Sequence, residues 1–253
     1  MLEVNAVDVL FCNCAHSEVI PKDRKRRILE ELEAAAVNLV AVSDLCGLAA
    51  ERAALLADLS KRPALKIVAC HPRAVRWLFH RGGAPLPATG AEILDMRARS
   101  ADDILSSLAL VPRVGSPAPA SSSVSPDTRR NDWIPWFPVI DYDRCTNCKQ
   151  CLEFCLFGVY ETGSEGKVTV ASPANCKTNC PACARICPQT AIVFPKVDDS
   201  PINGAEIGDE ALAHANAKIN LDRHLGGDVY AALALRKAKR KAQLLKKPDH
   251  SVP

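Results

Sequence analysis

The sequence lacks the long apolar segments of a membrane protein. No stretch approaches the roughly 20 consecutive apolar residues that a membrane span requires. The first residues (MLEVNAVDVLF) contain neither the basic region nor the long apolar region of a secretory signal peptide. These absences predict a soluble, cytoplasmic protein. No G-x-G-x-x-G motif follows any predicted strand, so we expect neither a flavin nor an NAD site.

A strong excess of one charge is also missing. The formal net charge is +3 over 253 residues, too small to identify a partner. Only residues 221–253 have a clear excess of positive charge, with eight Lys and Arg residues and three Asp residues. Apolar residues make up 48% of the chain and charged residues 24%, which is typical of globular proteins. At this length we expect two folded units with extensions.

Cysteine, by contrast, is abundant, with twelve in the chain. The cytosolic thiol pool keeps ordinary cysteines reduced. In a cytoplasmic protein, twelve cysteines therefore indicate metal binding or redox chemistry rather than structural disulfides.

Residues 1–113 have the pattern of an α/β domain with a small, parallel, Rossmann-like sheet. Short runs rich in Val, Ile and Leu are typical of buried parallel strands, and they occur at 7–12, 38–44 and 65–70. Apolar residues recur at helical spacing between these runs, at 22–36 and 48–60. We expect a further strand at 92–96 and a helix after it.

The rest of the chain divides by composition into three parts. Residues 114–131 are rich in Pro, Ser and Ala, which predicts a flexible linker. Residues 132–196 contain a repeated pattern of short strand, cysteine run and helix, with a β-hairpin expected around Gly163–Gly166. Residues 197–253 predict a helical, basic extension, with helices at 206–218 and 226–247. The basic helix could bind an acidic redox partner, nucleic acid or an anionic membrane, although a solvated helix face is the ordinary interpretation.

Eight of the cysteines form two dense runs within 43 residues. The segment CTNCKQCLEFC has the spacing C-x2-C-x2-C-x3-C, and CKTNCPACARICP has C-x3-C-x2-C-x3-C-P. Closely spaced thiolates on a curled loop favour an iron-sulfur cluster over zinc, which usually takes two distant C-x2-C pairs. The cysteines are Cys145, Cys148, Cys151 and Cys155 in the first run, and Cys176, Cys180, Cys183 and Cys187 in the second.

On these two runs, the Cys187-Pro188 ending and the flanking VIDYDRC and AIVF segments, residues 132–196 resemble the bacterial two-cluster [4Fe-4S] ferredoxins. The resemblance implies an α+β ferredoxin-like domain with a pseudo-twofold repeat and two [4Fe-4S] clusters. It also implies that each cluster takes one cysteine from the other run. The implied sets are Cys145, Cys148, Cys151 and Cys187 for cluster 1, and Cys155, Cys176, Cys180 and Cys183 for cluster 2.

Two features depart from the ferredoxin pattern. Leu156 follows Cys155 where the family usually has proline, and one extra residue separates Cys176 from Cys180. Residues 177–179 must therefore bulge. If this bulge keeps Cys176 from reaching its iron in the cluster, the site would hold a three-iron cluster or use another ligand. The resulting C-x3-C-x2-C is also the spacing of radical S-adenosylmethionine enzymes. The chain after Cys187 is too short for their barrel, which needs roughly 200 residues.

The remaining four cysteines all lie in the N-terminal domain. Each follows or ends a predicted strand: Cys12 and Cys14 in FCNC, Cys46 in SDLC, and Cys70 in IVAC. The carboxyl ends of parallel strands share one edge of a sheet, where ligands bind. Strand pairing is therefore expected to bring the four thiols together.

The segments FCNCA, SDLC and IVACHPRAVRWLF are similar to the N-terminal cluster-binding domain of the flavin-containing subunit of heterodisulfide reductase. The resemblance implies a third [4Fe-4S] cluster on these four cysteines, without the flavin module. The alternatives are core thiols at Cys46 and Cys70 with a dithiol or zinc site at Cys12 and Cys14. His16 and His71 flank the cysteines, and a histidine near a strand end is ordinarily a hydrogen-bonded structural residue.

The sequence therefore predicts an iron-sulfur electron-transfer protein that acts with redox partner proteins, as a component of an oxidoreductase rather than an enzyme alone. One alternative is a redox subunit that acts on a thiol or disulfide substrate at the N-terminal cysteines. The other is an iron-sulfur regulator whose basic helix binds nucleic acid, a partner that we do not expect.

Overall fold

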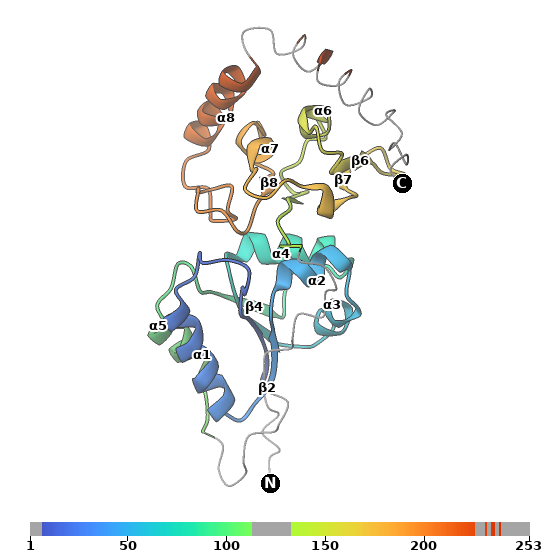
Figure 1. Cartoon of the computed structure of the whole chain (residues 1–253). Helices are drawn as coiled ribbons and strands as arrows, with labels where there is room; N and C mark the ends of the chain where they lie inside the picture. The colour runs from blue at the N-terminus through green and yellow to red at the C-terminus, as the bar shows by residue number, and fades with distance from the viewer. Residues whose placement is uncertain (1–6, 113–132, 226–230, 232–233, 236–237, 239–253) are drawn as a thin grey trace, which may run out of the picture. The chain divides into compact units, whose positions relative to one another are not determined.

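The computed structural model of the chain describes residues 7–112 and 133–225, together with 231, 234, 235 and 238 (Figure 1). The predicted linker at 114–131 and most of the predicted basic helix at 226–247 lie outside the described residues. In the part of the chain that is described, no helix has the length and apolar character needed to cross a membrane.

The chain divides into two compact units that each take two separate pieces of sequence. Unit 1 comprises residues 1–135 and 195–206, and unit 2 comprises residues 136–194 and 207–253. The chain therefore leaves unit 1, forms the body of unit 2, and returns to unit 1 for twelve residues. We call residues 195–206 the return segment.

A four-stranded, all-parallel sheet forms the centre of unit 1. It has the order β2-β1-β3-β4. Its central strand β1 pairs with β2 over six residues and with β3 over three, and its side chains Val9, Leu10 and Phe11 are fully buried. The strands are β1 (Val7–Cys12), β2 (Val37–Val42), β3 (Leu65–Ala69) and β4 (Ala91–Asp95).

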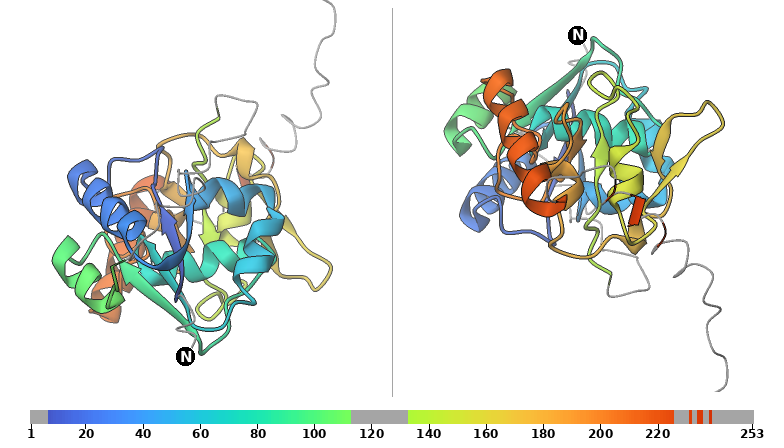
Figure 2. Two further views of the ribbon diagram at one scale, coloured as in Figure 1. Left: turned by 90° about the horizontal axis from the view of Figure 1, so that it is seen from below. Right: turned by 90° about the horizontal axis from the view of Figure 1, so that it is seen from above.

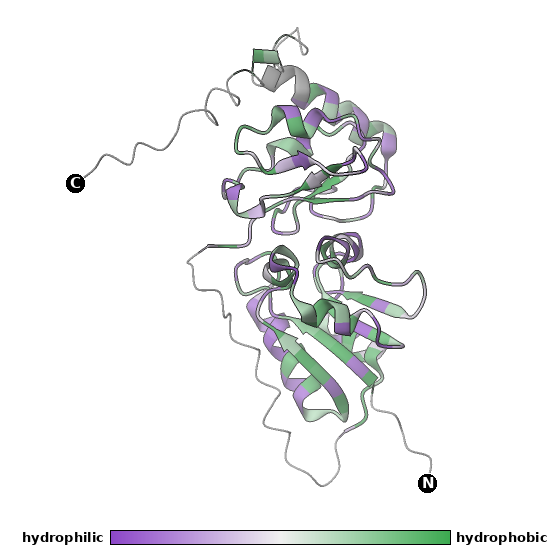
Figure 3. Ribbon diagram, turned by 90° about the vertical axis from the view of Figure 1, so that its right-hand side faces the viewer, coloured by the Kyte–Doolittle hydropathy of each residue, from purple (hydrophilic) through white to green (hydrophobic). Residues whose placement is uncertain are grey.

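Helices cover both faces of this sheet. Figures 1 and 2 show α1 and α5 on one face and α2, α3 and α4 on the other, and α1 contacts α5 while α2 contacts α4. In Figure 3 the strands of unit 1 are mostly hydrophobic in colour, whereas the helices carry hydrophilic residues as well. The α/β prediction for this domain is confirmed. The helices are α1 (Lys22–Ala34), α2 (Leu45–Glu51), α3 (Ala54–Leu59), α4 (Pro72–Arg81) and α5 (Ala101–Leu108).

The strand order creates a switch point between β1 and β3. From β1 the chain crosses to β2 on one side, and from β3 it crosses to β4 on the other. In open α/β sheets, ligands bind outside the carboxyl ends of the strands at such a point. Cys12 and Cys70 lie at these two strand ends.

Residues 136–194 of unit 2 form short strands and short helices in a repeated order. Their first half contains β5 (Val139–Ile140), α6 (Gln150–Phe154) and β6 (Tyr160–Thr162). Their second half contains β7 (Val168–Val170), the 3₁₀ turn η1 (Pro173–Asn175), α7 (Ala182–Arg185) and β8 (Ile192–Val193). The antiparallel pairs are β5 with β8 and β6 with β7, and the β6–β7 hairpin turns around Gly163–Gly166.

The C-terminal part differs from the predicted extension at its start. Residues 197–206, expected to begin a helical extension, contain no helix and belong to unit 1. Buried Val197 and Ile202 anchor them. Helix α8 (Glu210–Leu225) begins later than the predicted 206–218. It belongs to unit 2, where Glu210 accepts two hydrogen bonds from Arg144, at 2.8 and 2.7 Å.

Candidate metal centres

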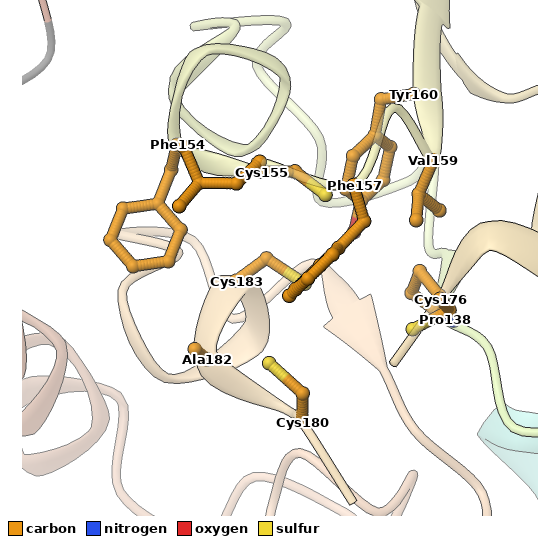
Figure 4. Close-up of a pocket in the computed structure, with 11 residues that line it drawn as sticks. Pro138, Phe154, Cys155, Phe157, Val159, Tyr160, Cys176, Cys180, Ala182 and Cys183 are labelled. Atoms are coloured by element: carbon orange, nitrogen blue, oxygen red, sulfur yellow. The ribbon is translucent and has the colours of Figure 1, made fainter. Parts of the chain in front are cut away.

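Four cysteines line one pocket of unit 2. Cys155, Cys176, Cys180 and Cys183 surround a space of about 220 Å³ (Figure 4). The rest of the wall is mainly apolar and includes Phe154, Leu156, Phe157 and Val159. The pocket thus unites one thiol from the first cysteine run with three from the second.

The extra residue in the second run is absorbed by a turn. Asn179 adopts a left-handed conformation, with φ of +62°, which asparagine tolerates better than most residues. The backbone N–H of Cys180 donates to the carbonyl of Lys177 at 3.1 Å. Cys176 therefore remains on the wall of the same pocket as the other three thiols, despite the departure from the ferredoxin spacing.

The thiols of this pocket are buried to different degrees, since Cys155 and Cys183 are buried whereas Cys176 and Cys180 are half-buried. Burial raises the pKa of Cys176 to about 12 and that of Cys183 well above its usual value. The Tyr160 hydroxyl donates to Cys183 Sγ at 3.1 Å, and only 3% of Tyr160 is exposed. A metal group must displace the protons of such thiols when it binds.

The other four cysteines of unit 2 line a second, smaller pocket of about 20 Å³. They are Cys145, Cys148, Cys151 and Cys187. The loop that carries the first three is tightly curled, because Asn147 and Lys149 both have left-handed backbones, with φ of +57° and +61°. The Asn147 side chain fixes this loop to the hairpin by donating to Gly166 O at 2.9 Å and accepting from Val168 N at 3.0 Å.

Burial again raises the pKa of the thiols in the second pocket, at Cys151 and at Cys187. Cys187 Sγ also accepts a hydrogen bond from the backbone N–H of Ala191 at 3.3 Å. The two pockets divide the eight cysteines into the same two sets that the ferredoxin resemblance implies. Cys155 of the first run lies in the pocket of the second-run cysteines, and Cys187 of the second run lies in the pocket of the first-run cysteines.

The four N-terminal cysteines lie near the carboxyl edge of the unit 1 sheet. Cys12 ends β1, Cys14 follows with a left-handed backbone, Cys46 lies in the first turn of α2, and Cys70 directly follows β3. All four are buried, with at most 9% exposed. Cys12 Sγ and Cys14 Sγ are 3.5 Å apart, and Cys12 Sγ accepts from Leu45 N at 3.3 Å.

These four thiols also act on each other electrostatically. The shared hydrogen bond lowers the pKa of Cys12 and raises that of Cys14. Burial raises the pKa of Cys46 well above its usual value and that of Cys70 to about 12. Cys12 and Cys70 contribute to the shifts of the other thiols. The group is therefore one electrostatic site, with the donor set that iron-sulfur clusters and zinc share.

Charged residues near these thiols were not predicted from the sequence. Asp44 is the N-cap of α2 and accepts from Cys46 N at 2.8 Å and Gly47 N at 3.3 Å. Its other oxygen accepts from Lys196 Nζ at 2.5 Å. An Asp just before a helix is a recognisable N-cap signal. Lys196 lies 152 residues away in sequence, and no local pattern identifies it.

His71 is a structural residue in this arrangement. Its Nδ1 lies 2.7 Å from Asp95 Oδ2, and both side chains are largely buried. Burial opposes ionisation of Asp95, but the hydrogen bond and charge of His71 lower its pKa below the usual value. His71 and Asp95 thus fix the start of α4 to the end of β4, beside Cys70.

Within the described residues, no three His, Cys, Asp or Glu side chains converge closely enough to hold a single metal ion. A four-iron cluster differs from an ion because its ligands bind separate irons at the corners of a cube. In unit 2, four cysteines line each pocket, the number of separate ligands that one such cluster takes.

Comparison with known proteins finds similarity over part of the chain, mainly in unit 2. A family model described as a 4Fe-4S dicluster domain matches residues 137–214. An uncharacterised ferredoxin of Methanocaldococcus jannaschii is 48% identical over 68 residues, which are 26% of this chain and 45% of that protein. Ferredoxin-3 of Nostoc sp. strain PCC 7120 is 35% identical over 77 residues, covering 23% of this chain and 78% of that protein. No solved structure matches.

The chain thus spans less than half of the archaeal relative. The family match supports the ferredoxin prediction and begins at residue 137. The resemblance of residues 7–80 to the heterodisulfide reductase subunit stays a prediction.

Proposed function

We propose that this chain, which belongs to the ferredoxin family, relays single electrons through two [4Fe-4S] clusters in unit 2 and a third in unit 1. The observation that carries this proposal is that four thiols line each of two pockets in unit 2. A bound [4Fe-4S] cluster supplies one-electron oxidation and reduction. The rest of the function depends on how the chain holds and shields these groups.

The proposed ligands of cluster 1 are Cys145, Cys148, Cys151 and Cys187, and those of cluster 2 are Cys155, Cys176, Cys180 and Cys183. Apolar side chains such as Phe154 and Val159 line the cluster 2 site. The Tyr160 hydroxyl and the Ala191 N–H donate to ligand sulfurs. Burial and such hydrogen bonds are the features by which a protein sets cluster potentials.

The proposed ligands of the third cluster are Cys12, Cys14, Cys46 and Cys70. Their burial, their common electrostatic site and their position at the switch point of an α/β sheet support this assignment. A third centre would make the chain a link between two redox modules. Its donors and acceptors are then redox partner proteins that exchange one electron at a time.

Anaerobic reconstitution with iron and sulfide tests the number of clusters. We expect about twelve irons per chain, with loss of about four in the double variant Cys46→Ala/Cys70→Ala and in Cys145→Ala/Cys148→Ala. Each double variant is the control for the other, because it should keep the EPR signals that the other loses. About eight irons, unchanged in Cys46→Ala/Cys70→Ala, would exclude the third cluster.

Cys176 has its own test, because the extra residue precedes Cys180. The variant Cys176→Ala should lose about one iron and show the EPR signal of an oxidised three-iron cluster, because three cysteines remain at the site. Wild-type iron content and spectra in this variant would show that another group is the fourth ligand.

The 3.5 Å separation of Cys12 and Cys14 favours a second candidate function. As a dithiol, the pair would reduce a substrate disulfide to two thiols and itself become a disulfide. Burial limits access to these thiols. Alkylation of Cys12 or Cys14 by iodoacetamide in the iron-loaded protein would favour this function, whereas protection favours the cluster.

A further inference from the structure

The return segment packs against the same edge of unit 1 that carries the N-terminal cysteines. Arg97, which follows β4, has only 7% of its side chain exposed. Its guanidinium donates to Pro195 O at 3.1 Å and Val197 O at 2.9 Å, and pairs with Asp198 at 3.2 Å. The backbone on both sides of Lys196 is thereby fixed.

The other end of the return segment is anchored to α4, the helix that begins just after Cys70. Arg73 donates to Pro201 O at 3.2 Å. Gly204 approaches the helix so closely that an added Cβ would lie 2.6 Å from Ala74 Cβ. The segment is thus held in place independently of Lys196.

Lys196 brings a buried positive charge into this site. Only 7% of its side chain and 2% of that of Asp44 are exposed. Burying two charges costs more free energy than a surface pair does, and such a pair adds little stability by itself. Asp44 also accepts from Cys46 N, so the ion pair is joined directly to the backbone of a proposed ligand.

The charges act on the thiols themselves. Burial and Asp44 raise the pKa of Cys46, whereas the positive charge of Lys196 opposes the shift. Burial would lower the pKa of Lys196, but Cys46 and Asp44 raise it, so the ammonium stays charged. Arg97 has the corresponding effect on Cys70. The return segment therefore supplies one cation near these cysteines and orients a second.

We propose that Lys196 is a positioning residue of the N-terminal cysteine site, whose buried ammonium offsets the thiolate charge and raises the site's reduction potential, with Asp44 as its opposing charge. This inference rests on the proposed third cluster. One-electron reduction adds a negative charge to the site, and a nearby buried cation stabilises that charge strongly because screening by water is weak.

The test is an EPR-monitored potentiometric titration of the full-length, iron-loaded protein, with dithionite as the one-electron donor. The signal missing in Cys46→Ala/Cys70→Ala identifies the N-terminal centre. Lys196→Met should shift its midpoint potential to more negative values, by about tenfold in the one-electron equilibrium constant, or about 59 mV. Asp44→Asn should shift it in the opposite direction, while its side-chain oxygen can still accept from Cys46 N.

Two control variants accompany these measurements. Lys196→Arg keeps the charge and should keep the potential near that of the wild type. Lys66→Met removes a partly buried cation near the start of β3, where it pairs with Glu92, and should leave the potential unchanged. The clusters of unit 2 provide an internal reference in every sample, since none of these substitutions alters their ligands.

A more negative potential in Lys196→Met together with a less negative one in Asp44→Asn supports the proposal, because a purely structural role would not give effects of opposite sign. The reverse pair of shifts would overturn it. Twelve irons with no shift, or with shifts of the same sign, would overturn the role of Lys196 and leave the third cluster intact. Eight irons in the wild type would overturn both. If Lys196→Met loses its N-terminal irons, Asp44→Asn decides: a higher potential supports the proposal, and an unchanged or lower one overturns it.

Discussion

At the scale of single residues, Tyr160 makes the most specific contact with a proposed ligand. Its hydroxyl donates to Cys183 Sγ at 3.1 Å from a buried position. Tyr160→Phe removes this donor and little else. We expect the potential of cluster 2 to fall, because the hydrogen bond stabilises the more negative reduced state. A differential contribution of about 1 kcal/mol corresponds to roughly 40 mV for one electron.

Tyr142→Phe is the matched control for this measurement. The Tyr142 hydroxyl donates to Val168 O at 2.9 Å in the same unit, and its removal should leave the potential of cluster 2 unchanged. Equal shifts in the two variants, measured by potentiometric EPR titration, would mean that the tyrosines act through general packing. A shift confined to Tyr160→Phe identifies the sulfur hydrogen bond as the cause.

The candidate ligands were predictable because their chemistry is local in sequence. The spacing of the runs indicated iron-sulfur sites, and the ferredoxin resemblance implied which cysteines of the two runs share a cluster. The position of Cys12 and Cys70 at strand ends predicted that the N-terminal thiols would meet. Lys196 was not predictable, because its role depends on a long-range contact that no periodicity records. Asp44 was intermediate, since its N-cap position is recognisable but its buried partner is not.

At the scale of elements, the return segment depends on the close approach of Gly204 to α4. Gly204 has φ of +97°, and an added Cβ would lie 2.6 Å from Ala74 Cβ. Gly204→Ala should therefore destabilise unit 1 through both backbone strain and overpacking, each about 1–3 kcal/mol. The measurement is the free energy of unfolding in urea, monitored by circular dichroism at a fixed iron content.

Gly90→Ala separates these two costs. Gly90 has a similar φ of +101°, and within the described residues nothing lies within 4 Å of an added Cβ. The Gly90→Ala variant should show the cost of backbone strain alone. Gly204→Ala should therefore destabilise the protein more than Gly90→Ala does, by about 1–3 kcal/mol. Equal effects in the two variants would contradict the packing of residues 195–206 on α4.

Helices and strands with regular apolar patterns were predicted well, and irregular segments were not. The buried strands β1 and β3 lie close to the predicted runs, because buried parallel strands are typically continuous runs of apolar residues. Residues 197–206 contain few apolar residues, and besides buried Val197 and Ile202 they are held by backbone carbonyls that accept from Arg73 and Arg97. Such donors lie far away in the chain, so composition alone suggested only the start of an extension.

At the scale of the whole molecule, the chain crosses between units three times, after residues 135, 194 and 206. Composition predicted one crossing at the linker, and it predicted no return, because the return segment is only twelve residues long. Each unit nevertheless has its own core and its own cysteines. Metal binding and folding should therefore be coupled within a unit rather than across the chain.

This organisation predicts two unfolding transitions in anaerobic calorimetry of the iron-loaded protein. Cys145→Ala/Cys148→Ala should lower the melting temperature of one transition, because unit 2 loses a cluster that binds only its folded state. Gly204→Ala should lower the other. When the double variant and the glycine variant are combined, each transition should shift by the same amount as in the corresponding separate variant. A single transition that moves with every substitution would show instead that the two units unfold as one cooperative body.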